Sequence, residues 1–173
     1  MQLLAAGTSP RGTVLGPMAE VVLHSTQYLE PADIRAMAVY LKGLPQAATD
    51  TDPREVPLAA GAVLERGGKL YREHCASCHG DKGQGVPGAY PRLVGNRAVT
   101  LGVTSNLVQV VLHGGFGPAT QGVPRPFGMP PFATVLSDAD VAAVITYIRS
   151  SWNNRAAPVS ELSVAQQRSS TRE

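Results

Sequence analysis

Cys75-Ala76-Ser77-Cys78-His79 is the stretch around which the rest of this chain is organised. Two cysteines three positions apart, followed directly by a histidine, form the attachment pattern of a c-type haem. Each thiol can form a thioether with a vinyl group, and the imidazole can take one axial position on the iron. The stretch therefore predicts one covalent haem c, with Cys75 and Cys78 as attachment points and His79 as an iron ligand.

A zinc half-site and a disulfide are the alternative interpretations of this stretch. Cys75 and Cys78 are the only two cysteines, and no second Cys-x-x-Cys or His-x-x-x-His pair exists in the sequence. Structural zinc requires four ligands, so this pair alone leaves the site incomplete. A redox-active Cys-x-x-Cys is expected beside a βαβ pattern, whereas the segments here have helical periodicity. Both alternatives are therefore less favoured than haem.

The second axial ligand is expected in Gly128-Met129-Pro130-Pro131-Phe132. Glycine permits close backbone approach and the prolines stiffen a loop that could hold the Met129 thioether against iron. Methionine opposite histidine is typical of electron-transfer cytochromes with a raised potential. Met129 could instead fill core space, although its loop setting speaks against that. His113 is the other candidate, and bis-histidine ligation would lower the potential; we expect Met129.

Composition narrows the class of protein. The chain has 173 residues, a net charge of +2 and a pI near 8.7, which argues for neither nucleic acid nor an anionic membrane as a partner. No run of about 18 apolar residues is present, so no transmembrane segment is expected. Only 5% of the residues are aromatic, as expected if a porphyrin supplies apolar volume. Residues 1–10 lack the basic and apolar regions of a secretory signal.

Two similar amphipathic helices are predicted, one opening at residues 30–33 and one at residues 137–140. In both, an apolar residue precedes the cap, Ala-Asp and an aliphatic residue follow, and a tyrosine comes seven positions after the aspartate. The matching residues are Leu29 and Leu136, Asp33 and Asp140, Ile34 and Val141, and Tyr40 and Tyr147. The chain therefore contains an internal repeat whose first copy lacks the Cys-x-x-Cys-His stretch.

This repeat defines the expected domains. Residues 1–45 are interpreted as the carboxyl-terminal remnant of a preceding haem-binding domain, with Met18 as the counterpart of Met129; the alternative is an accessory helix packed on the intact domain. Residues 46–57 have the composition of a linker. Residues 58–155 form the intact domain, and the polar residues 156–173 are expected to be a mobile tail or a strap onto a larger subunit.

The intact domain resembles the class I cytochromes c, an all-α family in which short helices surround one haem. There, a glycine and an aromatic residue before the first cysteine let the first helix cross the last one closely. Gly67, Tyr71 and Tyr147 match these positions. The family also places a proline twelve residues after the haem histidine, and its carbonyl accepts a hydrogen bond from the imidazole. Pro91 stands at that offset.

Further residues of the intact domain are expected around the haem. An axial imidazole needs an acceptor for its free N–H, which supports the assignment of Pro91 independently of the family. Arg92 and Asn96 are candidate partners of the haem propionates, the alternative for both being an ordinary surface loop. Phe116, Phe127 and Phe132 are expected to line the pocket and exclude water.

A narrower resemblance covers nearly the whole chain. Residues 18–29, 38–45 and 147–154 are similar to the end of the second and to the third haem domain of triple-haem cytochrome c subunits. These subunits belong to membrane-associated bacterial dehydrogenases of alcohols, gluconate and nicotinate-type substrates. The resemblance implies a location in the periplasm or on the outer face of the cytoplasmic membrane, with peripheral membrane association. It also implies that the chain is a fragment, because the first domain and most of the second are absent.

This resemblance implies a function as an electron carrier. The iron would pass one electron at a time from a dehydrogenase catalytic subunit to a quinone or an oxidase, without itself being the catalyst. A free-standing soluble carrier is the first alternative. A haem peroxidase is the second, and it would need an open sixth position on the iron instead of a Met129 ligand.

Overall fold

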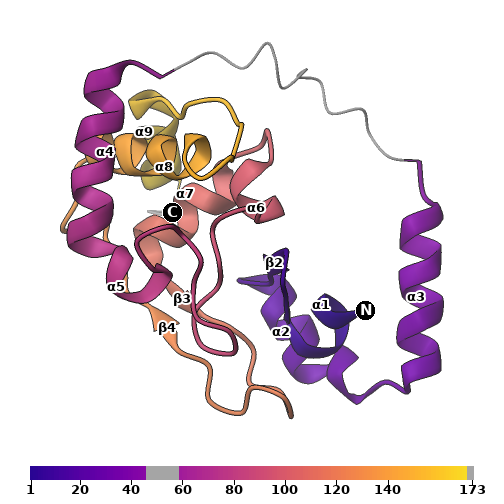
Figure 1. Ribbon diagram of the computed structural model, residues 1–173. Helices are drawn as coiled ribbons and strands as arrows, with labels where there is room; N and C mark the ends of the chain where they lie inside the picture. Colours follow the sequence, from indigo (N-terminus) through magenta and orange to yellow (C-terminus); the bar gives the residue numbers. More distant parts are fainter. Residues whose placement is uncertain (46–58, 171–173) are drawn as a thin grey trace.

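The computed structural model describes residues 1–45 and 59–170 (Figure 1). Within these ranges the chain is mainly helical, so the predicted all-α class is confirmed. The helices are α1 (Gln2–Ala6), α2 (Pro17–His24), the 3₁₀ helix η1 (Thr26–Tyr28), α3 (Pro31–Gly43), α4 (Gly61–His74), α5 (Ala76–His79), α6 (Arg97–Thr100), α7 (Ser105–His113), α8 (Asp138–Ser150) and α9 (Glu161–Ser169). Two short antiparallel pairs complete the fold: β1 (Thr8–Ser9) with β2 (Gly12–Thr13), and β3 (Gly115–Phe116) with β4 (Gly128–Met129). The predicted linker 46–57 lies outside the described residues.

Residues 59–170, which we call the main lobe, are built on a close crossing of α4 and α8 (Figure 1). Gly67 makes this crossing possible, because a Cβ there would overlap the carbonyl oxygen of Ala143 and the Cβ of Tyr147. Tyr71 is fully buried at the same contact, with its ring centroid 5.6 Å from that of Tyr147. The roles predicted for Gly67, Tyr71 and Tyr147 are thus confirmed.

The core of the main lobe lies between α8, α7 and α4. Val108 and Leu112 of α7 and Val141 and Ile145 of α8 are fully buried in it. Tyr71 adds a polar anchor, since its hydroxyl donates a hydrogen bond to the Gly80 carbonyl at 2.6 Å. Desolvation by burial raises the pKa of this hydroxyl, so it stays a donor at any physiological pH.

The start of α8 follows from its sequence. The Ser137 hydroxyl accepts a hydrogen bond from the Asp140 N–H, and the Asp140 carboxylate accepts one from the Ser137 N–H, each at 3.2 Å. This reciprocal capping box satisfies donors that a helix start leaves unpaired. Asp140 also forms an ion pair with Arg66 of α4 at 2.7 Å, which ties the capped end to the helix that α8 crosses.

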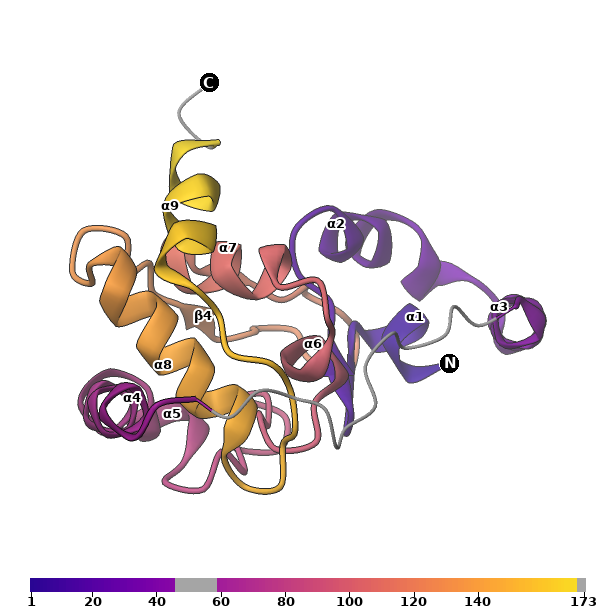
Figure 2. The ribbon, with the colours of Figure 1, turned by 90° about the horizontal axis from the view of Figure 1, so that it is seen from above.

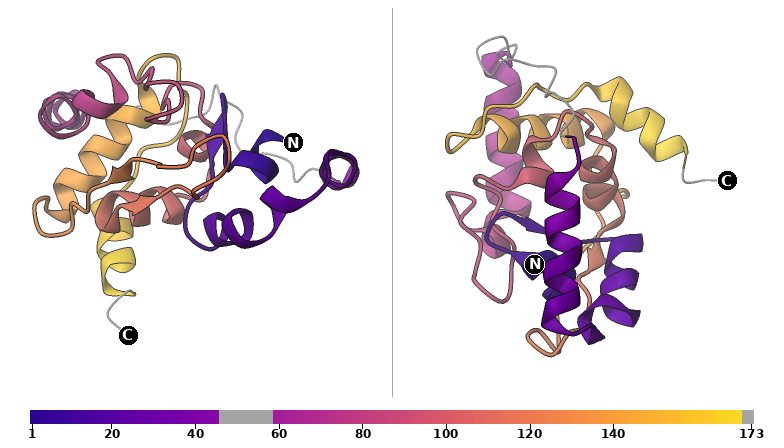
Figure 3. Two further views of the ribbon diagram at one scale, coloured as in Figure 1. Left: turned by 90° about the horizontal axis from the view of Figure 1, so that it is seen from below. Right: turned by 90° about the vertical axis from the view of Figure 1, so that its right-hand side faces the viewer.

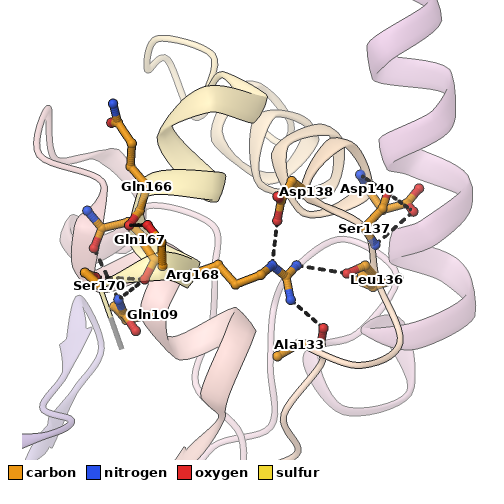
Figure 4. A network of polar contacts seen from close by, with 11 residues as sticks. Gln109, Ala133, Leu136, Ser137, Asp138, Asp140, Gln166, Gln167, Arg168 and Ser170 are labelled. Atoms are coloured by element: carbon orange, nitrogen blue, oxygen red, sulfur yellow. Dashed lines mark hydrogen bonds and ion pairs between the residues drawn. The ribbon is translucent and has the colours of Figure 1, made fainter. Parts of the chain in front are cut away.

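Residues 161–169 form helix α9, whereas the sequence predicted a mobile tail or a strap in this part of the chain. Figure 4 shows Arg168 reaching from α9 to the start of α8 and the segment before it. Its guanidinium donates to the Asp138 carboxylate at 2.6 Å, to the Leu136 carbonyl at 3.0 Å and to the Ala133 carbonyl. Val164 of the same helix is fully buried in the core. Together with a hydrogen bond from the Gln109 amide of α7 to the Gln167 carbonyl at 3.1 Å, these contacts dock a largely polar helix against α7 and α8.

Residues 1–45, which we call the N-terminal lobe, lie beside the main lobe (Figure 2). Helix α1, the β1–β2 pair and α2 pack together, and the Thr26 hydroxyl donates to the Leu4 carbonyl at 2.5 Å. Helix α3 lies at the far side, away from the main lobe. None of the helices in the described ranges has the length and apolar character that crossing a bilayer requires.

Candidate functional site

The Cys-x-x-Cys-His stretch occupies the turn at which α4 ends and α5 begins. The Cys75 N–H donates to the Tyr71 carbonyl, and the His79 N–H donates to the Cys75 carbonyl, each at 2.9 Å. This short helical turn presents Cys75, Cys78 and His79 to one cavity of about 730 Å³. Burial raises the pKa of the Cys75 thiol to about 11, and neither cysteine is in a disulfide. In the described ranges no group of three or more His, Cys, Asp or Glu side chains could hold a metal ion.

His79 is oriented by Pro91, at the offset that the sequence indicated. The His79 Nδ1 lies 2.9 Å from the Pro91 carbonyl oxygen. A carbonyl can only accept, so Nδ1 carries the proton and Nε2 keeps its lone pair for a metal. Burial lowers the pKa of His79, an effect that the hydrogen bond to Pro91 partly opposes. The imidazole is therefore held in the neutral form that metals bind.

The loop between His79 and Pro91 returns to the motif through backbone hydrogen bonds. The Gly85 N–H donates to the His79 carbonyl at 2.7 Å, and the Leu93 N–H donates to the Gly83 carbonyl at 2.7 Å. These bonds bring the Pro91 carbonyl next to the imidazole. The glycine-rich stretch 80–88 thus serves to position Pro91.

Met129 lines the same cavity as Cys75, Cys78 and His79. It lies in β4, paired with Gly115 of β3, and the following loop is fixed to the end of α7. There the Phe132 N–H donates to the Val111 carbonyl at 3.1 Å, and the Ala133 N–H donates to the Leu112 carbonyl at 2.9 Å. A half-buried Met129 and the His79 ring therefore face one space from two rigid supports.

Arg92 and Asn96 were both predicted as propionate partners, but the structure places only Arg92 at the cavity. Asn96 is only 5% exposed and caps α6 instead: its side-chain oxygen accepts from the Ala98 N–H, and its amide donates to the Arg92 carbonyl, each at 2.9 Å. An asparagine before a helix is a favoured cap, which gives Asn96 a structural role in place of the expected contact with haem.

Two of the three predicted aromatic residues line the cavity. Phe127 and Phe132 do so, whereas Phe116 is 71% exposed and lies outside the lining, which corrects the expectation for that residue. Its ring lies along the backbone of Gly128 on the paired strand, turned toward solvent. His74 was not expected at the site, yet it lines the cavity and contacts Phe132 with ring centroids 5.9 Å apart.

Part of the cavity wall comes from the N-terminal lobe, which the sequence did not indicate. The lining residues include Gln2, Ala6, Thr8, Thr13 and Leu15. No local pattern could have revealed them, because their place depends on how the two lobes pack. His113, the alternative ligand, closes α7 and is not among the lining residues.

The cavity fits a covalent haem c in both size and chemistry. Its volume of about 730 Å³ lies within the range of about 300 to 1,000 Å³ that is usual for cofactor sites. Two thiols, a neutral imidazole and a thioether line it together with apolar residues such as Phe132 and Val86. This donor set suits haem iron better than a hard cation, which prefers oxygen ligands.

Comparison with known proteins supports this assignment. The cytochrome c family matches residues 64–152, which span α4 to the end of α8. The chain is also 38% identical over 103 residues to cytochrome c-552 of Thermus thermophilus, a match covering 56% of this chain and 68% of that protein. The expected cytochrome c fold is confirmed by these matches.

Longer matches are to cytochrome c subunits of dehydrogenases. The chain is 35% identical over 159 residues to the cytochrome c subunit of the quinone-type alcohol dehydrogenase of Gluconobacter oxydans, covering 88% of this chain and 33% of that subunit. It is 36% identical over 167 residues to the gluconate 2-dehydrogenase cytochrome c subunit of Pantoea cypripedii, covering 90% of this chain and 37% of that subunit. The narrower resemblance is thus confirmed, and the chain spans about a third of the length of these relatives.

Proposed function

The chain belongs to the cytochrome c family, and from this premise we propose that it carries single electrons on one covalent haem c whose axial ligands are His79 and Met129. The observation that carries the proposal is that both side chains face one cavity, with the His79 Nδ1 proton engaged by Pro91 at 2.9 Å. Haem iron supplies the one-electron chemistry when it is bound. The surrounding residues hold it, orient its ligands and exclude water.

The lining of the cavity favours the reduced state. The ferric centre carries one more positive charge than the ferrous centre, and apolar surroundings stabilise that charge poorly. Phe127, Phe132 and Val86 provide such surroundings, and the Met129 thioether is a neutral ligand. A reduction potential above that of a solvent-exposed or bis-histidine haem is therefore expected.

Replacing Met129 tests the ligand assignment. Met129→Leu should keep the haem attached, change its ligand-sensitive absorption spectrum and lower its reduction potential, because a neutral sulfur ligand is lost. Met18→Leu is the matched control, since Met18 is 44% exposed and does not line the cavity. Unchanged spectrum and potential in Met129→Leu would reject Met129 as the ligand.

The partner proposal rests on the relatives. We infer that the electron donor is the catalytic subunit of a dehydrogenase on the periplasmic side of the membrane, and that a quinone or an oxidase is the acceptor. The matches to alcohol and gluconate dehydrogenase subunits support this inference. It predicts rapid haem reduction when such a catalytic subunit and its substrate are added, and slow reduction when either is omitted. Equal rates with and without the catalytic subunit would favour a free-standing carrier.

The domain proposal concerns residues 1–45. We infer that they are the carboxyl-terminal part of a preceding cytochrome c domain, with Met18 as the axial methionine of that domain. The similarity of α3 to α8 in length and sequence pattern supports this inference. So does the extension of the dehydrogenase-subunit matches beyond the residues of the family match.

A further inference from the structure

The N-terminal lobe contributes a continuous part of the cavity surface. Ala6 of α1, Thr8 and Thr13 of the β1–β2 pair, and Leu15 line the same cavity as His79 and Met129. Figure 3 shows the N-terminal lobe, in indigo and purple, beside the main lobe. Gly7, which directly precedes β1, lies against Pro118 in the connection between β3 and β4, which also borders the cavity. This surface comes from residues far from the Cys-x-x-Cys-His stretch in the chain.

The contacts between the two lobes are made next to these lining residues. The Arg97 N–H donates to the Arg11 carbonyl at 3.0 Å, which joins the β1–β2 turn to the start of α6. The Gln27 amide donates to the Ala119 carbonyl at 3.2 Å. Gly7 is buried against the ring of Pro118, with no room for a Cβ. The N-terminal lobe is therefore attached to the main lobe at two places, the start of α6 and the connection between β3 and β4.

We propose that residues 2–15 are a wall of the haem pocket, which shields the haem from water and small anions and helps to set its reduction potential. This inference rests on the proposed function, since it assigns the N-terminal lobe a role toward the same haem. The reduction potential of a haem depends on its solvent exposure and on nearby charge. A wall that covers part of the haem therefore influences its reduction potential. The wall also decides which side of the haem is open to partners.

The proposal is tested by placing a negative or a positive charge on the wall and comparing the direction in which the reduction potential shifts. In Ala6→Glu a carboxylate faces the cavity and should stabilise the ferric state, whereas Ala6→Lys should stabilise the ferrous state. We expect changes in opposite directions, each on the order of tenfold in the redox equilibrium constant, which is about 59 mV for a one-electron couple. Ala5→Glu and Ala5→Lys are matched controls, because Ala5 belongs to the same helix but is exposed and does not line the cavity.

The potentials of all four variants are measured by redox titration of the haem-loaded full chain, with the absorption spectrum recorded in each. Equal shifts at positions 5 and 6, or none at either, would overturn the proposal. Failure of the proposed function looks different, because the chain would then bind no covalent haem or Met129→Leu would change nothing.

Access to the haem gives a second measurement. Gly7→Ala places a methyl group on the Pro118 ring and should separate the lobes, so azide should bind the ferric haem more tightly. Apparent affinity scales with the fraction of molecules that are open, and we expect a gain of about tenfold. Gly16→Ala imposes a comparable strain at φ 58° but meets nothing within 4 Å. Equal azide affinity in both variants and the parent chain would contradict a shielding wall.

Discussion

Helices α3 and α8 are both 13 residues long and have the same sequence pattern, yet α8 is largely buried and α3 is largely exposed. In α8 nearly every residue from Val141 to Arg149 is buried, against α4 on one side and α9 on the other. In α3 Ile34 is buried, while Tyr40 is 69% exposed. The same amphipathic pattern therefore yields a core helix or a surface helix, according to whether a partner lies against it.

The exposed face of α3 corresponds to the face by which α8 contacts α4. Ala143 and Tyr147 of α8 lie against Gly67, and their counterparts Ala36 and Tyr40 are exposed. A helix with a glycine at the equivalent position would complete α3 in the way that α4 completes α8. This is the geometry expected if α3 belongs to a preceding cytochrome domain, and it supports the domain proposal.

The largest effect is expected where α8 meets its partner. Gly67→Val should destabilise the main lobe by about 3 kcal/mol or more, because overpacking a tight contact forces backbone shifts. Ala36→Val on α3 should change stability by less than about 0.5 kcal/mol, as is usual for exposed positions. Chemical denaturation followed by circular dichroism measures both. A mild effect of Gly67→Val would mean that the crossing of α4 and α8 is adaptable.

Arg149 and its counterpart Lys42 give the next contrast. The Arg149 side chain is 1% exposed and donates to the carbonyls of Val99 at 2.6 Å, Leu101 at 2.8 Å and Ala157 at 2.8 Å. Desolvation lowers its pKa, and no carboxylate accompanies it among its described partners.

Arg149→Met should cost about 2 kcal/mol, because it leaves buried carbonyls unsatisfied while relieving a buried charge. Lys42→Met at the exposed end of α3 should cost almost nothing. The midpoint of urea unfolding measures both variants. A more stable Arg149→Met protein would show that relief of the buried charge outweighs the three lost hydrogen bonds.

A smaller and pH-dependent contrast is expected at the helix starts. Hydrogen bonding to Ser137 and the nearby Arg66 guanidinium lower the pKa of Asp140 below its ordinary value, although desolvation opposes them. Its contribution is therefore complete above the ordinary carboxyl pKa and is lost as the pH falls through the lowered one. Asp140→Ala should cost about 1 kcal/mol at pH 7, as for a lost cap, and should flatten the loss of stability below about pH 4.

Asp33→Ala is the matched control at the start of α3, where no side-chain cap is formed. Asp33→Ala should change neither the stability at pH 7 nor the way in which stability falls below about pH 4. Equal costs for the two variants at pH 7 would show that the capping box contributes little.

What could be predicted from the sequence was local. The haem motif, the place of Met129 at the cavity, the Pro91 contact and the capped start of α8 each depend on residues close together in the chain or on a fixed offset. Helix α9 was missed because Val164 is its one fully buried residue, and the polar partners of Arg168 and Gln167 lie on segments distant in the chain. The wall from the N-terminal lobe was missed for the same reason, because packing between distant segments leaves no periodic signal.

The smallest expected effect on stability, that of Tyr40→Ser, distinguishes the two interpretations of α3: part of a preceding domain, or an accessory helix on the main lobe. Tyr40→Ser should change the free energy of unfolding by less than about 0.5 kcal/mol, because this side chain is 69% exposed. Tyr147→Ser at the matching position of α8 should cost several times more, since it removes the ring packed on Gly68 and Tyr71. If Tyr40→Ser destabilised the chain as much, α3 would have to fold onto the main lobe in solution, as an accessory helix does. A stable Tyr40→Ser protein instead leaves the α3 face available for the first helix of a preceding domain.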